Sequence, residues 1–268
     1  MARLRVTILG CGSSGGVPRV AQGWGLCDPA EPRNRRRRCS ILVEREDVGG
    51  ITRILIDTSP DLREQLIDAG VKALDAVVYT HEHADHTHGI DDLRPLVILT
   101  RKRMPVYANR VTLDLLHERF GYCFATPPGS EYPPILTAHC IDDNDIFEIS
   151  GHGGSIRLQP LPLVHGNIVA LGFRIGDFAY TPDVSAIPES AVQHLAGLEC
   201  WVVDALRDTP HPTHFSLSDA LGWIERMRPK AAVLTNLHTD LDYRRLRSEL
   251  PEAITPAYDG MVIELDVR

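Results

Sequence analysis

Short apolar runs separated by polar turns recur along the whole chain, and many of them have the length and β-branched composition of strands. The predicted strands span residues 4–9, 40–43, 53–56, 76–80, 106–108, 156–163, 169–175, 177–180, 200–204, 231–234 and 261–265. Helical patterns lie between them at residues 59–70, 218–227 and 243–249. The first has an N-cap serine, Ser59, with Pro60 at the first helical position, and it stops at Gly70. Clustered strands with interspersed helices favour a mixed α/β fold with two sheets between helical layers.

The chain is predicted to form one domain over residues 1–268. Its 43% apolar content is ordinary for a soluble globule, and no Ser/Gly/Pro-rich linker divides it. The proline-rich stretch 126–134 is the nearest approach to a linker, but it is short and is interpreted as a surface loop beside the functional site.

No apolar run approaches the roughly 18 residues that span a bilayer, and residues 6–9 are too short for a secretory core. We therefore expect a cytoplasmic protein without membrane contact. Six scattered cysteines without a Cys-x-x-Cys pair favour reduced thiols. The net charge of −8 argues against binding of long nucleic acid, which needs clustered Lys and Arg, so a small substrate is expected.

The segment from Thr80 to Gly89 directly follows a predicted strand and holds four histidines and two acidic residues. So many nitrogen and carboxylate groups resist burial unless a cation organises them. Imidazole and carboxylate without thiolate favour borderline divalent ions such as Zn²⁺, Mn²⁺ or Fe²⁺. The segment therefore predicts a metal site, against the alternative of a polar surface turn.

Three further strand ends deliver polar side chains: His165 after residues 156–163, Asp183 after 177–180 and His238 after 231–234. Taken singly, these would be a core histidine, a turn aspartate and a surface histidine. Ligands gathered from several strand ends are, however, how a sheet builds a rigid open site.

The order and spacing of these residues resemble the metallo-β-lactamase fold superfamily of dinuclear hydrolases. The matching residues are His81, His83, Asp85, His86, His165, Asp183 and His238. The resemblance implies a four-layer αββα sandwich and two divalent ions, Zn or Mn. One ion would be held by His81, His83 and His165. The other would be held by Asp85, His86 and His238, and Asp183 would bridge the two.

Within that superfamily, the segments 10–19 and 34–40 resemble the phosphodiesterase branch, which includes the accessory phosphodiesterase of carbon–phosphorus lyase pathways and, more remotely, ribonuclease Z. Members of the nearer branch often carry a cysteine-rich structural zinc site. Here Cys27 stands alone and Leu241 takes the place of the expected histidine, so no structural zinc is predicted.

The resemblance also assigns roles outside the metal ligands. Asp57 either orients a ligand imidazole or is a simple turn residue. His214 fits a histidine that points at the substrate phosphate, against the alternative of a loop histidine. His211, Arg35 and Arg36 are candidates for substrate contacts, although the arginine run 33–38 is more readily explained as a solvated or ion-paired face.

The spacing of the glycine loop Gly10-x-Gly12-x-x-Gly15 matches the fingerprint of dinucleotide-binding folds. Pro18 and Gly23 interrupt the helix that should follow, which argues against that fold. The segment is interpreted as a tight loop near the site whose amides reach a phosphate oxygen.

We hypothesise a metal-dependent phosphodiesterase that acts on small, cyclic or nucleotide phosphodiesters through a metal-bridging hydroxide, with Asp85 orienting the hydroxide and His214 acting on the phosphate or the leaving alkoxide. The alternatives are a hydrolase of a thioester or lactam and a non-catalytic metal-binding protein. The natural substrate, the choice between Zn and Mn and the formation of a homodimer are left open.

Overall fold

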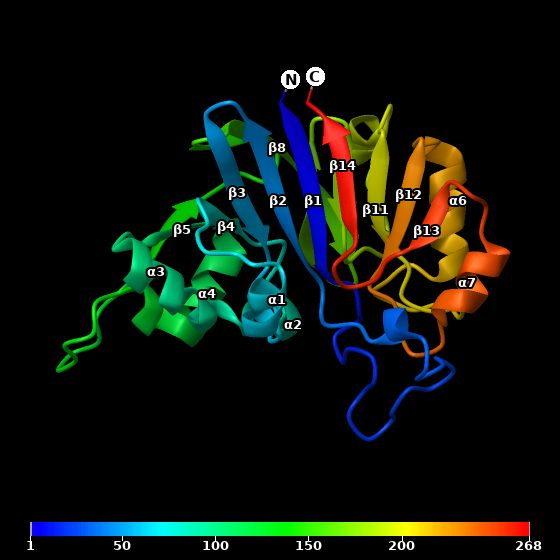
Figure 1. Cartoon of the computed structure of the whole chain (residues 1–268), viewed down its shortest axis with the longest axis horizontal. Helices are drawn as coiled ribbons and strands as arrows, with labels where there is room; N and C mark the ends of the chain where they lie inside the picture. The colour runs from blue at the N-terminus through cyan, green and yellow to red at the C-terminus, as the bar shows by residue number, and fades with distance from the viewer. Residues whose placement is uncertain (1, 268) are drawn as a thin grey trace.

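The computed structural model describes residues 2–267, and two seven-stranded sheets pack face to face within it (Figure 1). The strand order is β14-β1-β2-β3-β4-β5-β6 in the first sheet and β13-β12-β11-β10-β9-β8-β7 in the second. The N-terminal β1 and the C-terminal β14 pair antiparallel, which places the two ends of the chain side by side (Figure 1).

The strands of the first sheet are β1 (Arg3–Gly10), β2 (Ser40–Asp47), β3 (Gly50–Ile56), β4 (Ala76–Val78), β5 (Met104–Ala108), β6 (Leu136–Cys140) and β14 (Val262–Asp266). Those of the second are β7 (Phe147–Gly151), β8 (Gly154–His165), β9 (Ile168–Ile175), β10 (Phe178–Thr181), β11 (Cys200–Asp204), β12 (Ala231–Thr235) and β13 (Ile254–Pro256). The α-helices are α1 (Leu62–Asp68), α2 (Ala84–Thr87), α3 (Arg94–Thr100), α4 (Arg110–Phe124), α5 (Glu189–Val192), α6 (Leu217–Met227) and α7 (Tyr243–Glu249). Short 3-10 turns are η1 (Pro32–Asn34), η2 (Ile90–Leu93) and η3 (Gln193–Leu195).

Three apolar clusters define four layers. Between the sheets, residues such as Ile54 and Ile56 of β3 and Phe173 of β9 are fully buried. A second cluster lies on the outer face of the first sheet against α1, α3 and α4, and a third lies on the outer face of the second sheet against α6 and α7. Burying both faces of each sheet in this way confirms the αββα sandwich.

Parallel pairing brings the ends of several strands to one edge of the sandwich. In the first sheet β3, β4, β5 and β6 run parallel, and in the second sheet β10, β11, β12 and β13 do so. Strand β8 runs antiparallel to β9, which runs antiparallel to β10, so β8 ends at the same edge as β10. A bond from the amide of Leu171 to the carbonyl of Thr80 joins the two sheets there.

Each of the eleven predicted strands corresponds to a strand of the structure, and α6 and α7 lie where helices were expected. Strands β6, β7 and β13 and helices α2, α3, α4 and α5 were not predicted. The N-terminus of the first helix was predicted wrongly: it begins at Leu62, and the Ser59 hydroxyl bonds to Asp61 and Gln65 in the turn before it.

The proline-rich segment 126–134 is a largely exposed surface loop, as expected, but its position was predicted wrongly. It follows α4 and projects away from the sandwich (Figure 1), and none of its residues lines the cavities beside the histidine cluster. Within residues 2–267, no helix is long and apolar enough to cross a membrane. The six cysteines are all unpaired thiols.

Candidate metal centre

Three imidazoles from two sheets converge at the edge where the strands end. His81 and His83 follow β4, and His165 is the last residue of β8. The Nδ1 atom of His83 lies 3.0 Å from Nε2 of His81 and 3.2 Å from Nε2 of His165. Their ligand atoms are close enough to share one ion, and they are the three residues that the resemblance assigns to the first metal.

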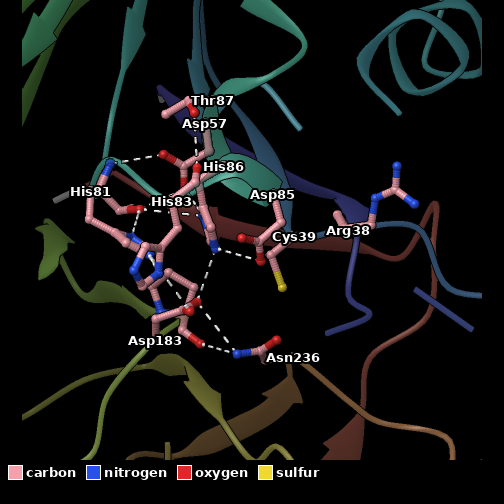
Figure 2. Close-up of polar contacts among 12 residues, drawn as sticks. Arg38, Cys39, Asp57, His81, His83, Asp85, His86, Thr87, Asp183 and Asn236 are labelled. Carbon is pink, nitrogen blue, oxygen red and sulfur yellow. Dashed lines mark hydrogen bonds and ion pairs between the residues drawn. The ribbon is translucent and has the colours of Figure 1, made fainter. Parts of the chain in front are cut away.

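A second set of donors lies against the first. His81, His86 and Asp183 form another group with metal-binding spacing. His86 Nε2 lies 3.2 Å from Asp183 Oδ1 and 3.5 Å from Asp85 Oδ2, and Asp183 Oδ2 lies 3.6 Å from His165 Nε2. Figure 2 shows Asp183 and Asp85 directed toward His86 from different sides. Asp183 thus touches both groups, as a bridging carboxylate would.

The chemistry of these donors fits a divalent cation. The Nε2 atom of His86 is buried and makes no hydrogen bond to residues 2–267, although it faces two carboxylates. Burial opposes a charge on this ring, yet Asp183, Asp85 and Asp57 outweigh it and raise the pKa of His86 well above its usual value. Three carboxylates around one buried ring therefore call for positive charge at this point.

The other two buried imidazoles are poised to act as neutral ligands. Burial, reinforced by the charge of His86, lowers the pKa of His81 well below its usual value. Burial also lowers the pKa of His165. A neutral ring is the form that donates a lone pair to a metal.

Asp57 contacts the ligand loop, the segment of residues 80–89 that carries His81, His83, Asp85 and His86. It follows β3 with a left-handed backbone, φ 66°, which few non-glycine residues adopt. Its carboxylate accepts bonds from the amide and the hydroxyl of Thr80, both at 2.8 Å, and it lies 2.8 Å from Nδ1 of His86. Fixing Nδ1 leaves Nε2 of His86 directed toward Asp183 (Figure 2).

We expect Asp57→Asn to weaken metal binding by about tenfold to a hundredfold, the usual effect of losing a carboxylate that orients a ligand imidazole. The affinity can be measured by competition with a chromogenic chelator. Asp75→Asn is the matched control, because Asp75, which directly precedes β4, also accepts a backbone amide, that of Arg53, but does not contact the cluster. Equal affinities in the wild type and the Asp57 variant would exclude this role.

His214 lies at the edge of the cluster and is held by a buried aspartate. Its Nδ1 atom is 2.8 Å from Oδ2 of Asp204, and its Nε2 atom is 3.9 Å from Oδ2 of Asp183. Burial favours the neutral ring, but Asp204 outweighs it and raises the pKa of His214 to about 9. Asp204 therefore favours the protonated form of this ring. His214 also forms a group of metal-binding spacing with His165 and Asp183.

His238 faces the same cavity but lies outside the groups with metal-binding spacing. Its Nε2 atom contacts Nη1 of Arg19, and its Nδ1 atom lies 3.1 Å from Asp240. Its assignment to the second ion stays a prediction, and the structure places the Arg19 guanidinium where that ligand nitrogen points.

The cavity that joins these groups has a volume of about 290 Å³. Its walls combine histidines, carboxylates and two arginines, and the lining residues are Ser13, Ser14, Arg19, His83, Asp85, His165, Asp183, Leu206, Arg207, His211, Thr213, His214 and His238. His211 lies 5.3 Å from His214 between ring centroids, so the structure brings this predicted substrate contact to the site.

Arg36 is not available to a substrate, contrary to the prediction. It is 2% exposed, and its guanidinium donates to the carbonyls of Leu241 and His238 and to Asn34. Its Nη1 atom also lies 3.8 Å from Sγ of Cys27. The guanidinium therefore links the loop around Cys27 to the segment that carries His238.

Arg35 does not line the cavity either; its guanidinium lies 5.3 Å from the ring of Trp24. Arg37 and Arg38 are paired with Asp68 and Asp61, so the run is largely an ion-paired face. The arginines at the cavity are Arg19 and Arg207, and neither was among the predicted substrate contacts, although Arg19 ends the segment 10–19 that carries the family resemblance.

The glycine loop keeps two amides free for a ligand. The amides of Gly12, Ser13 and Gly16 bond to backbone carbonyls within the protein. Within the described chain, the amides of Ser14 and Gly15 have no acceptor, and Ser14 lines the cavity. The hydroxyl of Ser13 also lines it, is buried and has no partner among residues 2–267. These groups suit an anionic oxygen.

The fold and the site define a metallo-β-lactamase-type hydrolase with a histidine and aspartate centre suited to divalent metal. Residues 52–236 match the family described as the beta-lactamase superfamily domain, and the chain belongs to that superfamily. A solved structure described as a new diphosphatase from the PhnP family is 35% identical, with a TM-score of 0.89 over 100% of this chain and 99% of that one.

Two further similarities say less about the activity of this chain. The structure of the short form of human tRNase Z is 17% identical over 97% of this chain and 98% of that one, with a TM-score of 0.62, and shows the shared fold alone. A curated octanoyltransferase of Porphyromonas gingivalis (strain ATCC BAA-308 / W83) is 34% identical over 99% of this chain but over 52% of its own length. The chain thus spans about half the length of that relative.

Proposed function

We propose that the chain is a dinuclear metal-dependent phosphodiesterase for small phosphodiesters and that residues 1–268 act as one domain. The observation that carries the proposal is that two overlapping groups of metal ligands meet at one cavity with His214, which Asp204 holds at 2.8 Å. The 35% identity to a PhnP-family diphosphatase along the full chain supports phosphorus rather than carbonyl chemistry.

We propose that His81, His83 and His165 hold one ion and that Asp85, His86 and His238 hold the other, with Asp183 between them. When bound, Zn²⁺ or Mn²⁺ supplies Lewis acidity toward a phosphoryl oxygen and lowers the pKa of water. Occupation by both ions requires Arg19 to leave Nε2 of His238, which it contacts in this structure.

The residues of the chain contribute positioning and proton transfer. Arg19 and Arg207 attract the anionic substrate into the cavity, and the free amides of Ser14 and Gly15 donate hydrogen bonds to its non-bridging oxygens. His214 carries a proton that it can give to the departing alkoxide, and Asp204 stabilises the protonated ring and fixes its orientation. Asp85 accepts a hydrogen bond from the attacking water and so orients it.

A carbonyl substrate is the second candidate, because the Porphyromonas gingivalis relative is named for octanoyl transfer. That protein is about twice as long as the aligned region, so its name leaves the activity of the matching half open. The same ligands and the same proton donor would serve a thioester.

Side-by-side assays separate these functions. With Zn²⁺ or Mn²⁺ supplied, we expect metal-dependent hydrolysis of bis-p-nitrophenyl phosphate and little turnover of nitrocefin or of octanoyl-glutathione thioester. Addition of a chelator should abolish the diester activity. Faster turnover of the thioester or the lactam would contradict the proposal, and retained metal without turnover of any ester would indicate a non-catalytic binding protein.

A further inference from the structure

A second depression lies beside the ligand loop. It has a volume of about 560 Å³ and is lined by His83, Ala84, His88, Arg119 and Phe120. Because His83 and Ala84 belong to the loop that carries the metal ligands, this depression adjoins the proposed reaction site. The part of a substrate that extends past His83 would therefore lie in it.

An aromatic ring forms part of this surface. Helix α4 departs from helical geometry at Phe120, where φ is −128° and ψ is 32°. Gly121 follows directly, and glycine tolerates such a kink. Phe120 is only partly buried: it packs against the apolar cluster under α4 and also lines the depression. The ring of His88 meets it edge-on, with centroids 5.6 Å apart.

A planar cation lies beside this ring. Arg119 is largely exposed, but its Nη1 atom donates to the carbonyl of Glu82 at 2.6 Å, which ties the guanidinium to the ligand loop. Within residues 2–267, the Arg119 guanidinium makes no ion pair and no hydrogen bond other than that to the Glu82 carbonyl, so no carboxylate neutralises its charge. Aromatic and guanidinium planes together are the groups on which nucleic-acid bases stack.

We propose that Phe120, His88 and Arg119 bind a planar ring of the substrate, so that the preferred substrates are nucleotide diesters. The inference deepens the proposed phosphodiesterase function and rests on it. The nucleobase would lie against Phe120 and Arg119 while its phosphate faces His83 and the metal ligands. An acyl chain would gain only apolar contact there and would leave the Arg119 charge without a partner, which favours the base.

The test compares ligands with and without a base. Binding of adenosine 5′-monophosphate and of ribose 5-phosphate to the metal-supplied protein is measured by calorimetry. We expect the nucleotide to bind more tightly than the sugar phosphate. Phe120→Ala should remove about fivefold to a hundredfold of the nucleotide affinity, the range found for loss of one stacked base, and leave ribose 5-phosphate unchanged. Phe120→Trp should preserve the preference.

Phe124→Ala is the matched control, because Phe124 lies on the same helix and packs against the same apolar cluster but does not line the depression. Equal binding of the two ligands, or equal losses in the Phe120 and Phe124 variants, would overturn the inference. These outcomes differ from failure of the proposed function, which would appear as absence of diester hydrolysis by the metal-supplied wild type.

Discussion

Asp183→Ala is expected to abolish retention of divalent metal. The carboxylate is almost fully buried and lies within 3.2 to 3.9 Å of four imidazoles, those of His81, His86, His165 and His214. Burial opposes its ionisation, but His86 foremost lowers the pKa of Asp183 well below its usual value, so the group is an anion. Alanine would remove the anion that touches both proposed ions. The buried ring of His86 would then have one carboxylate fewer to balance its charge.

Elemental analysis after dialysis measures this effect directly. We expect about two equivalents of zinc or manganese in the wild type, as two-metal hydrolases hold, and fewer than one in Asp183→Ala. Thermal unfolding gives an independent readout: a metal at a hundred times its Kd stabilises the folded state by about 2.7 kcal/mol, and the variant should gain none of this. Asp145→Ala, which removes an exposed carboxylate, is the control. Wild-type metal content in Asp183→Ala would contradict the assignment.

The ligand loop could be predicted from sequence because its evidence is local. His81, His83 and His86 occur within six residues directly after a strand, and burial of so many nitrogens in one turn has few explanations other than a cation. His165 and Asp183 needed the parallel arrangement of β8 and β10, which brings their strand ends to the same edge. Periodicity does not supply that pairing, and the family resemblance did.

Arg36 was misjudged because its contacts are far away in sequence. The carbonyl of Leu241, which accepts from its guanidinium at 2.7 Å, lies 205 residues later. A run of arginines appears exposed when it is considered alone, and only the folded chain shows which one is internal. Arg19 was missed for the same reason: it enters the cavity through the tertiary position of the glycine loop.

Asp204, the carboxylate that holds His214, was not singled out from the sequence. It ends β11 as an ordinary acidic residue, but burial raises its pKa to about 7, an effect that His214 opposes. Its second oxygen, Oδ1, is buried without a partner in residues 2–267. Asn236, with φ 62°, donates its amide to the carbonyl of Pro182. Asp204 ends the buried strand β11, and Asn236 directly follows the buried strand β12. A polar residue at the end of a buried strand is the sequence signal that could have identified both.

The fold was predicted where the strands are apolar and was missed at elements whose local pattern is weak. Strand β6, Leu136–Cys140, contains a threonine and a histidine, and β13 has three residues. Helix α4 lacks a strong apolar face because only four of its fifteen residues are buried. The two strands are held by pairing with neighbours rather than by local pattern: β6 pairs parallel with β5, and β13 pairs parallel with β12.

His214→Ala should separate proton transfer from metal binding. We expect full metal content and a fall in kcat on bis-p-nitrophenyl phosphate of about a hundredfold to ten-thousandfold, the usual contribution of a positioned acid. Asp204→Asn should lower kcat less, because the ring remains but loses the carboxylate at 2.8 Å that stabilises its proton. His152→Ala, which changes an exposed histidine of a distant hairpin, is the control.

His214 also lies within ligand distance of His165 and Asp183. Loss of metal in His214→Ala would therefore identify it as a ligand, and an enzyme with the wild-type rate would remove it from the mechanism.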